Sequence, residues 1–247
     1  MPQSAPEPAR PPHAGIATHE RLIVALDVPD AHSARKLVAQ MGDSVSFYKL
    51  GLELFMSGDY FQLLDWLVGL GKKIFADLKF FDIPATVAAA VKGLRGRGVT
   101  FTTVHGYPSI MEAAAQAKGE VKILAVTVLT SLDRRDLDEL GTGADVERLV
   151  VTRARHALQA GCDGVICSGQ EAALLRRQLD PRLLIVTPGI RPATNRPADD
   201  QKRVVTVEQA FRDGVDHIVV GRPIRDAADP RAAAESIQKT IATLFSS

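Results

Sequence analysis

After residue 20 one pattern repeats along the chain: a short, continuous run of apolar residues precedes a longer stretch with helical periodicity. The apolar runs do not alternate with polar residues, which is typical of strands buried on both faces, as in parallel sheets. Eight such strand–helix units fit into the 247 residues. They predict an α/β fold, the closed (β/α)8 or TIM barrel. A doubly wound open sheet is the alternative, but it usually has fewer strands.

The positions of the expected elements follow from these runs. We expect strands at residues 22–26, 45–50, 73–79, 99–104, 121–129, 164–167, 183–187 and 217–220. We expect helices at residues 31–42, 58–70, 84–97, 109–118, 145–160, 170–179, 206–213 and 230–245. Residues 21–247 contain no linker-like stretch and are expected to form a single barrel domain. Residues 1–20 are rich in proline and lack the apolar core of a signal peptide, so a disordered N-terminal extension is expected there.

The composition is that of a globular chain with no general preference for charged polymers. Hydrophobic residues make up 46% of the sequence, enough for a sizeable core, and the formal net charge is +1. No broad electrostatic field therefore favours nucleic acid or an anionic membrane as a partner. No segment approaches the roughly 20 apolar residues that span a bilayer. The two cysteines, Cys162 and Cys167, are expected to be buried free thiols of a cytoplasmic protein.

Polar residues follow several of the apolar strands at their C-terminal ends. These residues are Asp27, Lys49, Asp77 with Lys79, Thr130, Arg191 and Arg222. In TIM barrels the active site forms at this end of the barrel, from residues on several strands. Any single Asp or Thr among them could equally well be a helix cap or a turn residue. As a group, these residues predict an active site.

The most informative group lies at the end of the third expected strand. Asp77 and Lys79 are two residues apart, so on a regular strand their side chains point the same way, and Asp82 lies just beyond them. A buried ion pair with a purely structural role is the alternative, but such pairs are weak stabilisers. A lysine between two carboxylates stays charged, which suits an acid or a fixed positive charge rather than a covalent nucleophile. The group therefore predicts stabilisation and then protonation of a carbanion.

Two further segments indicate a site for an anionic ligand. Gly221 and Arg222 follow the last strand, where TIM barrels often bind phosphate through backbone N–H groups, although an ordinary turn is the alternative. The polar stretch from Pro188 to Arg203 is longer than most loops, so we expect it to cover the ligand; a plain surface loop is the alternative. His105 ends the fourth strand and is expected to be structural. The histidines show no metal-ligand spacing.

Together these segments resemble the orotidine 5′-monophosphate decarboxylase family. The matching segments are Leu26-Asp27, Lys49 to Phe55, Asp77 to Thr86, Leu129 to Ser131, Thr187 to Arg191 and Val220 to Ile224. They occur in the family's order across nearly all of residues 21–247. The resemblance implies a TIM barrel that decarboxylates orotidine 5′-monophosphate (OMP) to uridine 5′-monophosphate (UMP), the last step of pyrimidine biosynthesis. It implies that no metal ion or organic cofactor takes part.

The resemblance also implies catalytic roles for single residues. Lys49, Asp77 and Lys79 would form a charged tetrad with Asp82 of the partner subunit in a homodimer. Thr86 would likewise reach across to the other subunit's site. Within the tetrad, Asp77 would repel the carboxylate of the substrate, and Lys79 would stabilise and protonate the carbanion at C6.

Other residues would bind the nucleotide if the resemblance holds. Asp27 and Lys49 would hold the ribose, and Thr130 would lie near the pyrimidine. The phosphate end would be held by Arg191, Gln201, Gly221 and Arg222, with Gln201 on the closing loop. The chain departs from the family pattern at Ala85, where a polar residue is common, and at Gly106 to Ser109, where a small residue and a glycine pair are common.

Two other functions are alternatives to decarboxylation of OMP. A sugar-phosphate decarboxylase or lyase of the same superfamily would share the Asp-x-Lys-x-x-Asp pattern but use Mg²⁺, for which Asp77 and Asp82 are suitable ligands. Such relatives carry an acid where this chain has Lys49, and a lysine there would repel a metal ion. A non-catalytic barrel that only binds phosphorylated ligands would need the phosphate site but have no use for Lys79 between two acids.

Overall fold

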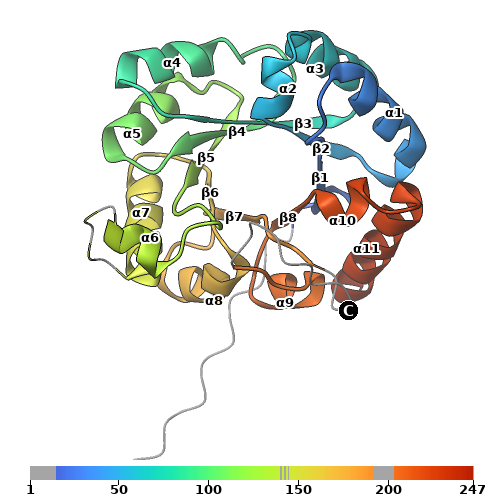
Figure 1. Cartoon of the computed structure of the whole chain (residues 1–247). Coiled ribbons are helices and arrows are strands. Elements are labelled where there is room, and N and C mark those ends of the chain that lie inside the picture. Colours follow the sequence, from blue (N-terminus) through green and yellow to red (C-terminus); the bar gives the residue numbers. More distant parts are fainter. Residues whose placement is uncertain (1–14, 140, 142, 144, 192–202, 247) are drawn as a thin grey trace, which may run out of the picture.

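The chain folds into a closed parallel barrel surrounded by helices (Figure 1). The structure is a computed structural model that describes residues 15–139, 141, 143, 145–191 and 203–246. Each strand pairs in parallel with the next one in the sequence, and β8 pairs in parallel with β1, which closes the barrel. The predicted (β/α)8 barrel is therefore confirmed.

The strands are short, and most of their residues are buried. Their bounds are β1 (Leu22–Ala25), β2 (Phe47–Leu50), β3 (Lys73–Phe80), β4 (Val99–His105), β5 (Lys122–Val126), β6 (Gly164–Ile166), β7 (Leu184–Thr187) and β8 (His217–Val220). Every residue of β1, β2, β7 and β8 is buried, because one face of each strand lines the barrel interior and the other lies beneath the helices.

The helices begin at sequence signals that are visible in the chain. Their bounds are α1 (Ala31–Met41), α2 (Leu52–Met56), α3 (Tyr60–Gly69), α4 (Pro84–Lys92), α5 (Pro108–Ala117), α6 (Arg134–Glu139), α7 (Val146–Gln159), α8 (Gly169–Gln178), α9 (Val207–Arg212), α10 (Arg222–Arg225) and α11 (Pro230–Phe245). The Asp30 carboxylate caps α1 by accepting from the Ser33 N–H at 2.7 Å, and Asp229 caps α11 in the same way. Proline stands in the first turn of α4, α5 and α11.

Many element boundaries differ from the sequence prediction by one or two residues, and the following differences are larger. The helix expected at residues 58–70 is α3, and a separate short helix that was not expected, α2, precedes it; the turn between them contains Gly58, which has a φ of 93°. The helix expected to reach residue 97 ends at Lys92, and turns with a positive φ at Gly96 follow it. The strand β5 ends at Val126, so Thr130 lies in the loop after the strand rather than directly at its end.

The last residues of the predicted N-terminal extension have a defined structure. Thr18–Glu20 form a 3-10 turn, and Ile16 packs against the apolar cluster inside the barrel. The expected disordered extension over residues 1–20 therefore does not reach residue 20. Its first part, residues 1–14, lies outside the described residues.

Aromatic side chains fill the barrel interior below the C-terminal ends of the strands. Phe101 contacts Phe47 and Phe75 at ring-centroid distances of 5.3 and 6.0 Å. The buried His217 packs edge-on against Phe101 at 5.3 Å, and burial lowers the pKa of His217 to about 4. The interior is thus a packed core, and Phe75 of this aromatic layer also lines the cavity described below. Among the described residues, no helix is both long and apolar enough to cross a bilayer.

Candidate active site

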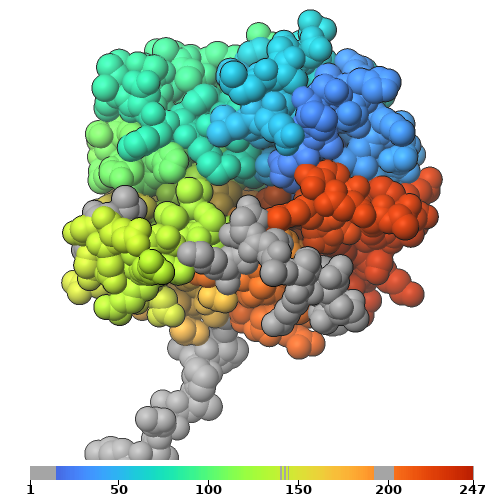
Figure 2. Space-filling view, in the orientation of Figure 1, coloured from blue at the N-terminus to red at the C-terminus, as the bar shows by residue number. Residues whose placement is uncertain are grey.

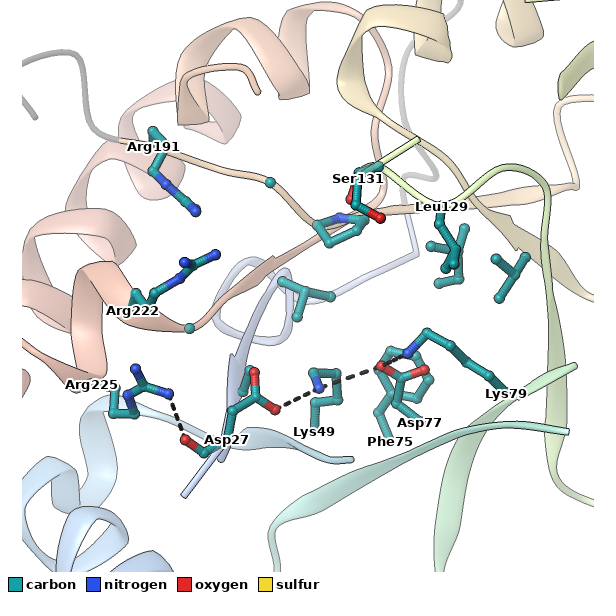
Figure 3. A pocket seen from close by; sticks show the side chains of 18 residues that line it. Asp27, Lys49, Phe75, Asp77, Lys79, Leu129, Ser131, Arg191, Arg222 and Arg225 are labelled. Carbon is teal, nitrogen blue, oxygen red and sulfur yellow. Dashed lines mark hydrogen bonds and ion pairs between the residues drawn. The ribbon is translucent and has the colours of Figure 1, made fainter. Parts of the chain in front are cut away.

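A cavity of about 480 Å³ lies at the C-terminal ends of the strands (Figure 3). Its size is in the usual range for small-molecule sites. The predicted site residues that line it are Asp27, Lys49, Asp77, Lys79, Thr130, Arg191, Gly221 and Arg222. The closed barrel brings these positions together because parallel strands end at the same side of the sheet.

Charged side chains of opposite sign alternate along one side of the cavity. The Lys49 Nζ lies 2.9 Å from Asp27 Oδ1 and 3.4 Å from Asp77 Oδ2. The Lys79 Nζ lies 2.8 Å from that same oxygen of Asp77. Figure 3 shows the resulting line of charges, from Asp27 through Lys49 and Asp77 to Lys79. Lys49 and Asp77 are buried, whereas Asp27 and Lys79 are partly exposed to the cavity.

The two buried members of this line hold each other in the charged state. Burial by itself would lower the pKa of Lys49, but the carboxylates of Asp77 and Asp27 outweigh it, and the pKa of Lys49 is raised. Burial by itself would raise the pKa of Asp77, but the positive charges of Lys49 and Lys79 outweigh it, and the pKa of Asp77 is lowered. An anion and a cation therefore stand side by side at neutral pH.

The backbone at Lys79 departs from a regular strand. Among the described residues, Lys79 is the only non-glycine residue with a positive φ, 46°. The pairing of β3 with β4 shifts register between Ala76 and Phe80. The predicted meeting of Asp77 and Lys79 is confirmed, but the expected reason, a regular strand pleat, is wrong: a bulge directs the lysine toward the carboxylate. Such a conformation costs on the order of 1–3 kcal/mol, and the surroundings must hold it in place.

Thr103 on β4 holds this bulge. Its hydroxyl accepts a hydrogen bond from the Lys79 N–H at 2.9 Å and donates one to Asp77 Oδ1 at 2.9 Å. The side chain is fully buried. One hydroxyl therefore fixes both the backbone of the lysine and the orientation of the carboxylate.

Three arginines line the cavity on the side away from Lys79 (Figure 3). Arg191 follows β7, and Arg222 and Arg225 are the first and last residues of α10. Arg191 is buried and donates to the Ile190 carbonyl at 2.9 Å. Arg191 and Arg222, at the ends of β7 and β8, suit the charged end of a phosphorylated ligand, because a guanidinium group can donate two parallel hydrogen bonds to a phosphate.

Two predicted site residues lie away from this cavity, and a third lies outside the described residues. Asp82 and Thr86 are exposed and do not line it; the Asp82 carboxylate accepts from the Ile83 N–H at 2.6 Å. Gln201 lies outside the described residues, as does most of the expected closing loop. His105 is half-buried, and its ring packs at a tilt against Phe81 with 5.1 Å between the centroids. Burial, followed by the charges of Lys79 and Arg153, lowers the pKa of His105.

The structure adds site residues that the sequence prediction missed. Thr103 is one, but β4 also carries Thr100 and Thr102, so nothing in the sequence singled Thr103 out. Gly51 is another: a Cβ there would lie 3.2 Å from Lys49 Nζ and 3.4 Å from Asp27 Oδ1, so a side chain would press on that ion pair. Ser131 and Arg225 also line the cavity. Arg225 follows the Gly-Arg-Pro-Ile motif directly, but nothing in its spacing indicates what it contacts.

The chain has a closed barrel with a cavity at one end, lined by lysines, carboxylates and arginines. These features define a class of proteins, the (β/α)8-barrel enzymes that act on anionic small molecules. Comparison with known proteins narrows the class. The chain belongs to the Orotidine 5′-phosphate decarboxylase / HUMPS family, whose sequence model matches residues 20–237. This result confirms the resemblance found in the sequence.

Individual relatives match almost the whole chain. An orotidine 5′-phosphate decarboxylase of Methylococcus capsulatus is 63% identical over 230 residues, 93% of this chain and 95% of its own. The enzyme of the same name from Xanthomonas euvesicatoria is 54% identical over 228 residues, 92% of this chain and 93% of its own. A crystal structure of orotidine 5′-phosphate decarboxylase from Lactobacillus acidophilus has a TM-score of 0.79 and 37% identity, and the match covers 90% of this chain and 99% of that one.

Proposed function

We propose that this protein decarboxylates OMP to UMP and CO2 in de novo pyrimidine biosynthesis. The observation that carries the proposal is the alternating line of charges, which holds the Lys79 amine 2.8 Å from the Asp77 carboxylate at one side of the cavity. An ammonium group fixed beside a carboxylate suits a reaction that expels CO2 and leaves a carbanion to be protonated. The near full-length relatives, which are named decarboxylases, support the same substrate.

The proposed placement of the nucleotide follows the two sides of the cavity. The phosphate would lie at Arg191, Gly221 and Arg222, with Gln201 as a further ligand. The ribose would lie at Asp27 and Lys49, and the pyrimidine near Thr130 with its reacting carbon toward Lys79. In this placement the phosphate of OMP lies beside arginines of opposite charge. The carboxylate that is to be lost instead lies beside the like charge of Asp77.

Asp77 would act on that carboxylate by repulsion. Two like charges 4 Å apart interact by about 4 kcal/mol at an effective dielectric constant of 20. Loss of CO2 relieves the repulsion, while Lys79 stabilises the negative charge at C6 and then gives it a proton. Enzymes lower barriers by roughly 8 kcal/mol or more, so repulsion alone is not enough. Binding of the distant phosphate would supply further energy to organise the charged site.

We further propose that the working unit is a homodimer in which Asp82 and Thr86 serve the partner's site. Both residues are exposed beyond β3, outside their own chain's cavity. Large apolar side chains are exposed on either side of Asp82 and on α2, which contacts β3, and such exposed apolar surface favours burial against another chain. They are Leu52 (54%), Met56 (79%), Phe81 (62%) and Ile83 (67%).

We also propose that residues 21–247 form a single barrel domain and that the protein works in the cytoplasm. The elements from β1 to α11 form one closed barrel within the described residues, which supports a single domain. The sequence prediction of free thiols is confirmed, because Cys162 and Cys167 are both buried and unbridged. Unbridged cysteines are the rule in a reducing compartment, which supports the cytoplasm.

The magnesium-dependent alternative fits the charges less well. The Lys49 amine lies within 3.4 Å of Asp77 and 2.9 Å of Asp27, where a divalent cation would meet a fixed positive charge. A non-catalytic barrel would need only the arginine side of the cavity. It would gain nothing from a strained backbone that presents Lys79 to Asp77.

A continuous absorbance assay tests the proposal. Purified protein with excess EDTA should convert OMP to UMP, and the loss of OMP absorbance should be as fast as with added Mg²⁺. Turnover that EDTA abolishes would favour the magnesium-dependent alternative. No turnover with or without Mg²⁺ would rule out OMP as the substrate.

The Lys79→Ala variant tests the role of the proposed acid. We expect kcat to fall by about a thousandfold or more, because both the proton donor and the cation beside C6 are lost. UMP should still bind, since the arginine side of the cavity is intact, and calorimetric titration with UMP measures this. A variant that keeps near-normal kcat would overturn the assignment of Lys79.

A further inference from the structure

Arg225 lines the cavity on the arginine side, and its three guanidinium nitrogens all donate hydrogen bonds (Figure 3). Its Nη1 donates to the main-chain carbonyl of Asp27 at 2.5 Å. Its Nε and Nη2 donate to the two carboxylate oxygens of Asp226 at 2.6 and 2.9 Å. The guanidinium group of Arg225 is therefore paired with a carboxylate on one side and hydrogen-bonded to a backbone carbonyl on the other.

These contacts connect the segments that follow the first and the last strand of the barrel. Arg225 is the last residue of α10, directly after β8, whereas Asp27 lies two residues beyond the end of β1. The Asp27 side chain in turn holds Lys49 at 2.9 Å, and Lys49 contacts Asp77 at 3.4 Å. Asp27 stands in a loop rather than in a strand, so the barrel's hydrogen-bond ladder does not fix its peptide plane. The bond from Arg225 fixes it instead.

We propose that Arg225, held in place by Asp226, is a positioning residue that fixes the main chain at Asp27 and so aims the Asp27–Lys49 pair at the nucleotide. This inference rests on the proposed function, in which Asp27 and Lys49 hold the ribose of OMP. Arg225 acts through Asp27 rather than as a phosphate ligand, because its charge is already paired bidentately with Asp226.

The proposal predicts a particular split of the kinetic constants. Arg225→Gln removes the bond to the Asp27 carbonyl, and water can replace it because the Arg225 side chain is 27% exposed. The fold should therefore survive while the ribose-binding pair loses its fixed position. We expect KM for OMP and the dissociation constant of UMP to rise about tenfold, because displacement of a binding group by a fraction of an ångström has effects of this order. The value of kcat should change by less than about threefold, because Lys79 and Asp77 keep their own contacts.

Asp226→Asn separates positioning from direct phosphate binding by the sign of its effect. Asp226 is 54% exposed and does not line the cavity. If Arg225 positions Asp27, loss of the Asp226 charge loosens the guanidinium group and raises KM. If Arg225 instead binds phosphate, the same change frees its positive charge and lowers KM. Arg225→Lys should have an intermediate effect, because an ammonium group can reach one acceptor but cannot make the bidentate pair.

A double-mutant cycle completes the test, read out as UMP affinity by calorimetric titration. In an Asp27→Ala background, Arg225→Gln should weaken UMP binding by less than about twofold, because the carboxylate that Arg225 positions through the main chain is gone. The matched control is Arg231→Gln, which breaks the exposed Arg231–Glu235 pair on α11 (2.7 Å) and should leave all constants unchanged.

An undiminished effect of Arg225→Gln in the Asp27→Ala background, a lowered KM in Asp226→Asn, or unchanged constants in Arg225→Gln would each overturn the inference. If one of these outcomes occurs and the wild-type protein turns over OMP, only the proposed role of Arg225 is wrong. Wild-type protein without turnover would instead remove the proposed function itself.

Discussion

At the scale of single residues, the site depends on small groups that hold the charged ones. Thr103 has no charge, yet it bonds both the Asp77 carboxylate and the Lys79 backbone. Burial opposes ionisation of Asp77, but the charges of Lys49 and Lys79 and the hydrogen bonds from Lys79 and Thr103 lower the pKa of Asp77. The charged state of the acid is therefore a property of the whole cluster rather than of Asp77 itself.

Thr103→Val tests this role, because it keeps the shape of the side chain and removes both hydrogen bonds. A donor to the ionised form of Asp77 is lost, so the pKa of Asp77 should rise. Below its pKa the carboxylate is neutral and the proposed repulsion of the substrate disappears, so the acid side of the kcat/KM profile should move to higher pH. The Lys79 N–H, whose hydrogen bond is partly buried, also loses its partner, which should lower the free energy of unfolding by about 1 kcal/mol.

The neighbouring Thr102 provides the matched control. It is equally buried, and its hydroxyl donates to the Ala76 carbonyl at 2.9 Å rather than to a charged group. Thr102→Val should lower stability in urea denaturation without moving the pH profile. If both variants have the wild-type profile, Thr103 does not set the charge of Asp77.

At the scale of elements, the sequence predicted what depends on local pattern and missed what depends on contact between distant segments. Each of the eight strands was located because continuous apolar runs persist wherever both faces of a strand are buried, and β8 was bounded correctly at both ends. The bulge at Lys79 was missed because it is stabilised by Thr103, 24 residues away. The site residues at the strand ends were predictable because the fold itself gathers those ends. The roles of Arg225 and Gly51 were not predictable, because they depend on how closely these residues approach Asp27 in the folded chain.

Another contact that no local pattern reveals joins three segments around the cavity. Arg203 pairs with the buried Glu171 of α8 and donates to the carbonyls of Val128 and Leu129 at 3.2 and 3.1 Å. These carbonyls directly precede Thr130, so the ion pair fixes the loop that carries a predicted substrate residue. Both charged side chains are almost completely buried.

Breaking this pair should have a large effect on stability. Arg203→Gln or Glu171→Gln alone leaves one buried charge without its partner, and we expect a loss of about 3–5 kcal/mol in the free energy of unfolding, measured by urea denaturation. The double change Arg203→Met with Glu171→Leu should be less damaging than either single one, since no unpaired charge remains. A double variant whose loss equals the sum of the two single losses would show that the two residues do not act as a pair.

At the scale of the whole molecule, the described chain contains only part of the proposed site. Asp27, Lys49, Asp77 and Lys79 form one continuous ionic cluster, whereas Asp82 stands exposed outside the cavity. No pattern within one chain distinguishes an acid that serves its own cavity from one that serves a partner. The resemblance supplied the shared site, and the exposed apolar side chains around Asp82 support it. Sharing a site makes a prediction that no single-chain arrangement makes.

Mixed dimers provide the test. In a dimer of one Lys79→Ala chain and one Asp82→Ala chain, a shared-site arrangement leaves one site with an intact Lys79 from one chain and an intact Asp82 from the other. After full exchange of subunits, equal amounts of the two inactive variants give such mixed dimers half of the time. Each mixed dimer has one complete site of two, so about a quarter of wild-type activity should return.

The matched control mixes Lys79→Ala with Asp77→Ala. Both changes fall on residues that serve their own chain's cavity, so every site in the mixture lacks one of them and no activity should return. Differently tagged chains that purify together establish that exchange has occurred. An inactive first mixture under those conditions would show that Asp82 does not act across the interface.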